Sequence, residues 1–211
     1  MEPPIIGFYH TVLNRRFFVQ RRTLKYYTGR SIALSCERTV ELPFAMRFIE
    51  EHAHDRFLEV GNVISHYFNF DHTVIDKYEI SPEVINEDVM DHTPPTDYQL
   101  IISISTVEHI GLDEEIKDDT KCIRTIERLK TWLEPSGIML ITVPIGTNPV
   151  IDRMILDNTV RFTDRVFLKR KSVLNNWVET NVTNALHATY NLNFPFANAV
   201  AFLIFERNES T

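Results

Sequence analysis

A carboxylate, a glycine and a second carboxylate mark the stretch of this sequence best suited to binding a ligand. Glu59 lies in an apolar segment, 56–60, that is typical of a buried strand; Gly61 follows it directly, and Asp76 ends the next such segment. In doubly wound α/β folds, such a glycine allows a tight turn, the following helix start offers free N–H groups, and the second acidic residue accepts ribose hydroxyls. The spacing therefore predicts a site for a nucleotide-like ligand.

The glycine loop narrows the choice of ligand. Dinucleotide-binding loops follow the pattern G-x-G-x-x-G, in which the second glycine lets the backbone approach the pyrophosphate. Here Gly61 keeps the first position, whereas Val63 and Ser65 stand at the next two alternate positions. Because Val63 would obstruct a pyrophosphate, the loop argues against NAD or FAD and favours a ligand without a phosphate.

The ends of the neighbouring strands supply further candidates, because ligands of open α/β sheets bind outside the carboxyl ends of the strands. A short strand is predicted over 84–89. The near-continuous apolar run over 98–106 is typical of a central parallel strand covered on both faces. Glu87 competes with Asp88 at the end of the short strand. The ligand-binding residues that we expect at these strand ends are Glu59, Gly61, Asn62, Asp76, Lys77, Asp88, Val89 and Ser103.

Glu108 and His109 are the candidates for catalysis. They follow the central strand, and either side chain could remove a proton from a hydroxyl or an amine. The sequence Ser105-Thr-Val-Glu108 is also a capping box, which would start a helix and explain Glu108 without any catalytic role. Both interpretations stay open from the sequence.

The elements that would position these residues alternate between strand and helix. Pro43 suits the first turn of a helix, where its missing N–H does no harm. Helices are predicted over about 43–52, 120–133 and 150–157, and later strands over 138–144, 166–171 and 199–207. The order predicts an α/β fold with a Rossmann-like, doubly wound sheet of seven strands. We expect this sheet to be mostly parallel, with a C-terminal antiparallel strand.

Composition and charge exclude several classes of protein. Hydrophobic residues make up 44% and charged residues 24% of the 211, as in ordinary globular domains. No apolar run reaches the roughly 18 residues of a spanning helix, and the N-terminus lacks the apolar core of a signal peptide. We therefore expect a cytoplasmic protein without a transmembrane segment. A net charge of −7 argues against nucleic acid as a partner, and the two cysteines and eight histidines lack metal-ligand spacing.

The basic residues are concentrated at the N-terminus. Residues 1–30 carry a net charge of +5, which leaves −12 for the remainder. We divide the chain into a basic, aromatic arm, 1–35, and a folded domain, 36–211. The arm could contact an anionic partner, a membrane surface or a neighbouring subunit of a homo-oligomer, or it could fold as a helix onto the acidic body.

Several stretches together resemble a family of class I S-adenosylmethionine (SAM)-dependent methyltransferase-like proteins. The resemblance covers roughly residues 37–206, and some of these relatives serve the making of surface sugars. The stretches are L-E-V-G-N-V-I-S-H-Y (58–67), T-V-I-D-K-Y-E (73–79), V-I-N-E-D-V (84–89), L-I-I-S-I-S-T-V-E-H-I-G (100–111), L-I-T-V-P-I-G (140–146), F-L-K-R-K-S-V-L-N-N-W (167–177) and F-P-F-A-N-A-V-A (194–201).

The resemblance implies a SAM-dependent methyltransferase that acts on a small-molecule or glycan acceptor. It implies that Glu59 lies near the SAM amino group, Asp76 binds the ribose, Asp88 contacts the adenine amino group, and Val89 packs on the ring. Because the glycine loop departs from the family's acidic-x-G-x-G-x-G pattern, a methyltransferase-fold binding or scaffold protein without activity remains the alternative. Side chains that could line an acceptor pocket are Arg38, Glu41, His66, Tyr67, Arg170, Asn175 and Trp177.

Overall fold

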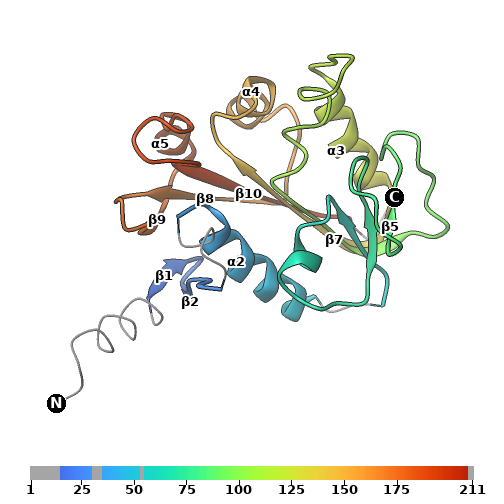
Figure 1. Cartoon of the computed structure of the whole chain (residues 1–211), viewed down its shortest axis with the longest axis horizontal. Coiled ribbons are helices and arrows are strands. Elements are labelled where there is room, and N and C mark those ends of the chain that lie inside the picture. The colour runs from blue at the N-terminus through green and yellow to red at the C-terminus, as the bar shows by residue number, and fades with distance from the viewer. Residues whose placement is uncertain (1–14, 30–34, 53–54, 209–211) are drawn as a thin grey trace.

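The computed structural model describes residues 15–29, 35–52 and 55–208, and a sheet of eight strands organises this part of the chain (Figure 1). The strand order is β5-β4-β3-β6-β7-β10-β8-β9. The first five strands in this order are parallel, whereas β10, β8 and β9 each run antiparallel to the strand before them. The strands are β3 (Phe57–Val60), β4 (Thr73–Ile75), β5 (Val84–Ile85), β6 (Tyr98–Ile104), β7 (Leu133–Pro144), β8 (Asp164–Arg170), β9 (Trp177–Thr180) and β10 (Ala199–Glu206).

Helices cover both faces of this sheet (Figure 1). One face carries α3 (Lys121–Thr131), α4 (Pro149–Asp157) and α5 (Val182–Leu186); the other carries α2 (Arg38–Glu51) and a hairpin of β1 (Arg16–Val19) and β2 (Arg22–Lys25). A 3₁₀ turn, η2 (Ile64–His66), follows β3. Within the described residues, no helix combines the length and the apolar character needed to cross a membrane.

The central strand β6 explains why both faces need cover. Leu100, Ile102 and Ile104 belong to the core cluster under α2, whereas Ile101 belongs to the cluster under α3, and all four are fully buried. Successive side chains of a strand point to opposite faces, so a continuous apolar run requires an apolar layer on each side.

The predicted Rossmann-like, mostly parallel sheet with a C-terminal antiparallel strand is confirmed, and β3 lies parallel beside β6 with Phe57 opposite Leu100. The predicted number of seven strands is wrong, because β9 pairs with β8 at the edge of the sheet. Only Trp177 of its four residues is buried. An edge strand that packs so little of its surface lacks the apolar run on which the prediction depended.

Helix α2 begins five residues earlier than predicted, so Pro43 lies inside the helix and not in its first turn. Proline has no N–H, which leaves the carbonyl of Thr39, four residues earlier, without a helical partner. The Thr39 carbonyl instead accepts the N–H of Tyr27 at 3.0 Å, and the Thr39 hydroxyl donates to the Tyr27 carbonyl at 3.0 Å. The proline thus creates the point at which the N-terminal hairpin joins the helix.

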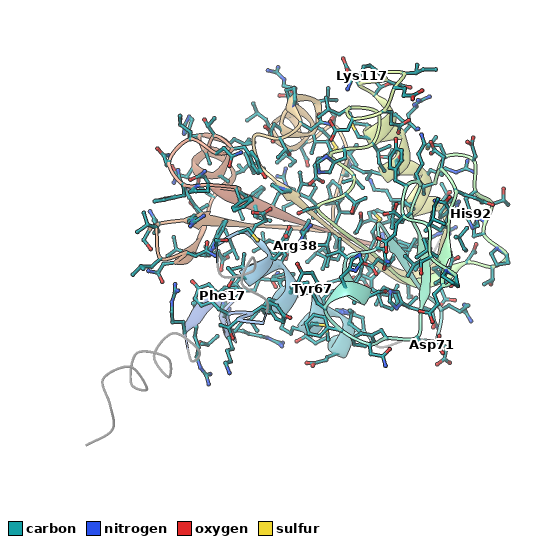
Figure 2. All side chains as sticks on the ribbon, viewed as in Figure 1. Phe17, Arg38, Tyr67, Asp71, His92 and Lys117 are labelled. Atoms are coloured by element: carbon teal, nitrogen blue, oxygen red, sulfur yellow. The ribbon has the colours of Figure 1, made fainter. Side chains whose placement is uncertain are left out.

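The described part of the predicted arm, residues 15–29, contains a hairpin and not a helix (Figure 2 labels Phe17 within it). Phe17, Val19 and Tyr26 are buried in the same core cluster as α2. The Tyr26 hydroxyl accepts the N–H of Trp177 at 2.8 Å. This segment is therefore packed onto the acidic body. Residues 1–14 and 30–34 of the predicted arm lie outside the described residues.

Candidate active site

A cavity opens at the carboxyl ends of β3, β4, β5 and β6, where open α/β sheets bind their ligands. We call it the first cavity. Six of the predicted site residues line it: Gly61, Asp76, Lys77, Asp88, Val89 and His109. The alternative candidate Glu87 lines it as well, together with Tyr78, Thr106, Ile110, Asp113 and Glu114.

Gly61 is required by the geometry of the turn after β3. Its φ of +84° is a left-handed conformation that side chains disfavour, and an added Cβ would lie 2.1 Å from Oγ1 of Thr106. Its N–H donates to the carbonyl of Ile75 at 2.8 Å, which holds the turn against the end of β4. The backbone of Gly61 therefore forms a wall of the first cavity without any side chain above it.

Asp76 connects the two loops that border the first cavity. Its Oδ1 accepts the N–H groups of Tyr78 and Glu79, both at 2.8 Å, and its Oδ2 accepts the N–H of Asn62 at 3.3 Å. A carboxylate offers about four acceptor positions, so about one remains for a ligand hydroxyl. Asp76 is half-buried, and its negative charge faces the cavity.

Two lysines and two carboxylates form a cluster at the side of the first cavity. Nζ of Lys77 lies 2.9 Å from Asp88 and 2.7 Å from Glu114, and Nζ of Lys121 contacts the same two carboxylates at 2.5 and 2.7 Å. Burial alone would raise the pKa of Asp88, but the hydrogen bonds from Lys121 and Lys77 outweigh it and lower the pKa to about 2. The two ion-paired carboxylates are therefore charged at neutral pH.

This cluster corrects one sequence interpretation and includes a carboxylate that the sequence did not single out. The strand predicted over 84–89 ends at Ile85, so Asp88 lies in the loop after β5 and not at the strand end. The acidic segment after Gly111, whose side chains resemble a solvated surface in the sequence, turns Glu114 inward, and the Glu114 side chain is only 12% exposed. Its two lysine partners account for its burial.

Three predicted ligand-binding residues support the first cavity from outside it. Oε1 of the fully buried Glu59 accepts the N–H groups of Val63 and Ile64 at 2.8 and 2.6 Å. The hydroxyl of Ser103 donates to the carbonyl of Val60 at 2.9 Å, and the amide of Asn62 donates to Glu79 at 2.6 Å. These bonds fix the shape of the turn after β3, as expected for a carboxylate that caps a turn.

A second cavity adjoins the first and shares His109 and Asp113 with it. Its walls come from the start of α2, the loop after β6, the loop after β7 and the segment before β10. The other residues that line this second cavity are Glu37, Arg38, Ser105, Glu108, Leu112, Pro144, Gly146, Thr147 and Tyr190. Both predicted catalytic residues therefore lie at this place, together with Arg38 from the predicted acceptor-pocket set.

The capping-box interpretation of Ser105 and Glu108 is wrong. No helix starts here, since residues 105–112 form turns and Ser105 has a left-handed φ of +42°. The Ser105 hydroxyl donates to Oε1 of Glu41 at 2.6 Å. Glu41 also accepts the hydroxyl of Thr142 at 2.7 Å and Nη1 of Arg38 at 2.5 Å. The hydroxyl that would cap a helix is thus used to hold the loop against α2.

Glu108 is left as a buried carboxyl with unused bonding capacity. Its side chain is 1% exposed, and among the described residues neither carboxyl oxygen has a hydrogen-bond partner. Nε2 of His109 lies 3.7 Å from its Oε1. Burial raises the pKa of Glu108 well above its usual range, and the charges of Glu41 and Glu37 raise it further against the opposing effects of its own N–H and Arg38.

The other residues considered for an acceptor pocket have structural contacts elsewhere. The guanidinium of Arg170 donates to the carbonyls of Ser35 and Pro195 through Nη1. Nε1 of Trp177 donates to Oδ1 of Asn175 at 2.8 Å. The remaining two do not line either cavity: His66 is the last residue of η2, and Tyr67 follows it. Among the residues that the structure describes, no group of three His, Cys, Asp or Glu side chains is placed to hold a metal ion.

Sequence comparison finds no relatives, since no protein-family model and no curated protein matches the chain. Solved structures do match. The N-methyltransferase NodS from Bradyrhizobium japonicum WM9 has a TM-score of 0.51 at 14% identity, over 82% of this chain and 97% of that one. NodS in complex with S-adenosyl-L-homocysteine (SAH) matches with a TM-score of 0.48 at 14% identity, over 81% of this chain and 91% of that one. An rRNA methylase from Streptococcus thermophilus matches with a TM-score of 0.44 at 14% identity, over 79% of this chain and 96% of that one. The first likeness shows a Rossmann-like methyltransferase fold.

Proposed function

We propose that the protein is a SAM-dependent methyltransferase that acts on a small-molecule or sugar-containing acceptor. The observation that carries the proposal is the first cavity, in which Gly61, Asp76 and Asp88 meet at the carboxyl ends of three neighbouring parallel strands. In this fold a cavity at that place binds a nucleoside-containing ligand. The second cavity beside it gives an acceptor its own place.

The residues that line the first cavity suit SAM in their chemistry. Asp76 has an acceptor position for a ribose hydroxyl, and Val89 and Ile110 supply apolar surface for an adenine ring. SAM contains no phosphate, so a loop with a single glycine can still accommodate it. The carboxylates of Asp76, Asp113 and Glu87 in the lining suit a ligand that carries an ammonium and a sulfonium group.

SAM supplies a methyl group on a positively charged sulfur, which an acceptor atom displaces directly. The residues of this chain then have two tasks: to align the acceptor with the methyl group, and to take up one proton. Alignment comes from the walls of the second cavity, which α2 and the loop after β6 hold rigidly through Glu41. Glu108 and His109 are the groups in that cavity that can receive the proton.

A binding or scaffold protein without activity is the second candidate, and one observation favours it. Nζ of Lys77, at the side of the first cavity, contacts Asp88 and Glu114, and Asp88 also accepts the N–H of Met90 at 2.9 Å. An adenine amino group would have to share or displace these contacts. Lys77 therefore competes with the adenine of SAM for Asp88, the residue that the resemblance assigns to the adenine amino group.

Calorimetric titration of the purified protein with SAM and with SAH separates the two candidates. We expect both to bind at one site with micromolar dissociation constants, as ligands do that bury an adenosine in a preformed cavity. A folded protein that gives no heat with either ligand would support the scaffold role. Transfer of a labelled methyl group from SAM to a panel of amines, alcohols and sugars then tests the enzymatic part of the proposal.

A further inference from the structure

The second cavity contains a buried acid, Glu108, whose carboxyl oxygens have no hydrogen-bond partner among the described residues. Glu41, behind the wall, has its acceptors occupied by Ser105, Thr142 and Arg38. Glu37, in the wall, accepts the N–H of Ala197 at 3.2 Å. Glu108 lines the cavity, and among the described residues both of its oxygens lack a hydrogen-bond partner. A buried acceptor without a donor is unfavourable, so the geometry leaves two acceptor positions for a ligand.

The charges around this cavity select the kind of ligand. Glu37, Glu108 and the rim residue Asp113 line it, and Glu41 lies behind its wall. Burial and the neighbouring carboxylates raise the pKa of Glu108, so a cation beside it is what favours its charged form. The guanidinium of Arg38 is already paired with Glu41 at 2.5 Å, so it offsets only part of this charge. An anionic acceptor such as a carboxylate or a phosphate would meet like charges in a site of low dielectric. A cation would be attracted.

The number of donors separates an amine from an alcohol. A primary ammonium carries three N–H donors and a positive charge, enough to serve both oxygens of Glu108, whereas a hydroxyl has one donor and no charge. The aromatic ring of Tyr190 in the same wall adds a surface that attracts cations. We propose that the second cavity is the acceptor site and that it takes an amine, bound as its ammonium ion by Glu108. This assignment rests on the proposed function.

The same residues can balance the proton in such a reaction. The bound ammonium gives one proton to the Glu108 carboxylate, which exposes the nitrogen lone pair. The nitrogen then forms its bond to the methyl carbon while the carbon–sulfur bond breaks and its electron pair stays on sulfur. His109 lies 3.7 Å from Glu108, and its Nδ1 lies 2.5 Å from Asp113 at the exposed rim, so it can pass the proton on to solvent.

The test compares small probes that share a propyl chain and differ in the charge of the head group. The full-length protein is titrated with propylammonium, with 1-propanol and with butanoate, while amide NMR signals of residues 105–113 report binding. We expect saturable binding of propylammonium, at least tenfold weaker binding of 1-propanol, and none of butanoate. Equal affinities of propylammonium and 1-propanol, or no saturable shift with propylammonium, would overturn the assignment.

Matched variants locate the binding to Glu108. Glu108→Gln keeps the shape of the side chain and removes its charge, so we expect propylammonium to bind at least tenfold more weakly, with an amide spectrum that shows the fold intact. Glu127→Gln makes the same change on α3, away from both cavities, where the side chain is 53% exposed, and should alter the affinity less than threefold. If Glu108→Gln leaves the affinity unchanged, Glu108 is only a buried neutral acid.

The outcome is independent of the test of the proposed function. Should SAH bind while propylammonium does not, the amine assignment fails and a methyltransferase with another acceptor stands. Should propylammonium bind through Glu108 while neither SAM nor SAH binds, the methyltransferase proposal fails and the amine site remains as a binding site.

Discussion

Substitution of Asp76 by alanine tests the assignment of the first cavity most directly. The Asp76 carboxylate accepts three backbone N–H groups, those of Asn62, Tyr78 and Glu79. Asp76→Ala therefore removes the acceptor of a ligand hydroxyl and also loosens the two loops that border the cavity. The two effects are separable, because the first changes ligand affinity and the second changes the free energy of unfolding.

The expected magnitude follows from the number of free acceptor positions. With three of about four positions already used, one hydrogen bond to a ribose hydroxyl is lost, not two. A hydrogen bond to a charged group contributes about 1.5–3 kcal/mol, which corresponds to a roughly ten- to 150-fold loss of SAH affinity. The N–H groups of Tyr78 and Glu79 are near the surface and can turn to water, whereas Asn62 is buried, so the free energy of unfolding should fall by about 2 kcal/mol.

The assay is calorimetric titration with SAH, accompanied by thermal unfolding of the same samples. Asp76→Asn should lose less affinity, because its amide oxygen still accepts hydrogen bonds. Glu79→Ala is the matched control: it removes one bond that supports the turn after β3 but no group that lines the first cavity, so it should weaken SAH binding less than Asp76→Ala does. If Glu79→Ala weakens SAH binding and Asp76→Ala does not, the ligand lies elsewhere than we infer.

Three further substitutions test the frame around the site. Gly61→Ala should lower the free energy of unfolding by about 3 kcal/mol in denaturant titration, because its φ is +84° and the new Cβ would meet Thr106; an unchanged midpoint would contradict this. Tyr26→Phe should cost about 1–2 kcal/mol by the same assay, since it leaves the buried N–H of Trp177 without its acceptor, and a neutral result would mean that the hairpin does not pack as described. Burial raises the pKa of Asp152 to about 6 against its hydrogen bond from Gly146, so the folded state resists ionisation more than the unfolded chain does. Stability is then lost as pH rises from about 4 through 6, and Asp152→Asn should gain about 1 kcal/mol at pH 7.5 and nothing at pH 3.5.

The first cavity could be predicted because its signals are local in sequence. The apolar run of β6 identifies a central strand. Gly61 directly follows β3 and Asp76 directly follows β4, and the apolar residues of each of these strands reveal it in the sequence. In a parallel sheet, the carboxyl ends of neighbouring strands meet at one edge, so local assignments suffice to bring these residues together. Glu59 shows the limit of such assignments. Its position was predicted, but its Oε1 accepts N–H groups of the turn and its Oε2 contacts Nε2 of His72 at 2.8 Å.

The second cavity could not be predicted in the same way, because its parts are distant in sequence. Ser105 and Glu108 match a capping box, and no local pattern shows that the Ser105 hydroxyl bonds Glu41, 64 residues away. Pro43 fits a first turn equally well, and only the contact of Thr39 with Tyr27 explains a proline inside the helix. Hydrophobic periodicity indicates which residues are buried but not which residues they contact. Contacts between residues that are distant in sequence therefore cannot be predicted from it.

This difference between the cavities has a consequence for how the molecule divides its tasks. The first cavity is built from strand ends whose positions the parallel sheet fixes. The second is built from Glu37 and Arg38 at the start of α2, Glu108 in a turn and Tyr190 before β10. Packing and long-range hydrogen bonds, such as those of Glu41 and Glu37, hold these segments together. If the second cavity binds the acceptor as we propose, substitutions there can change the charge presented to it without disturbing the sheet, and one fold could then serve different acceptors.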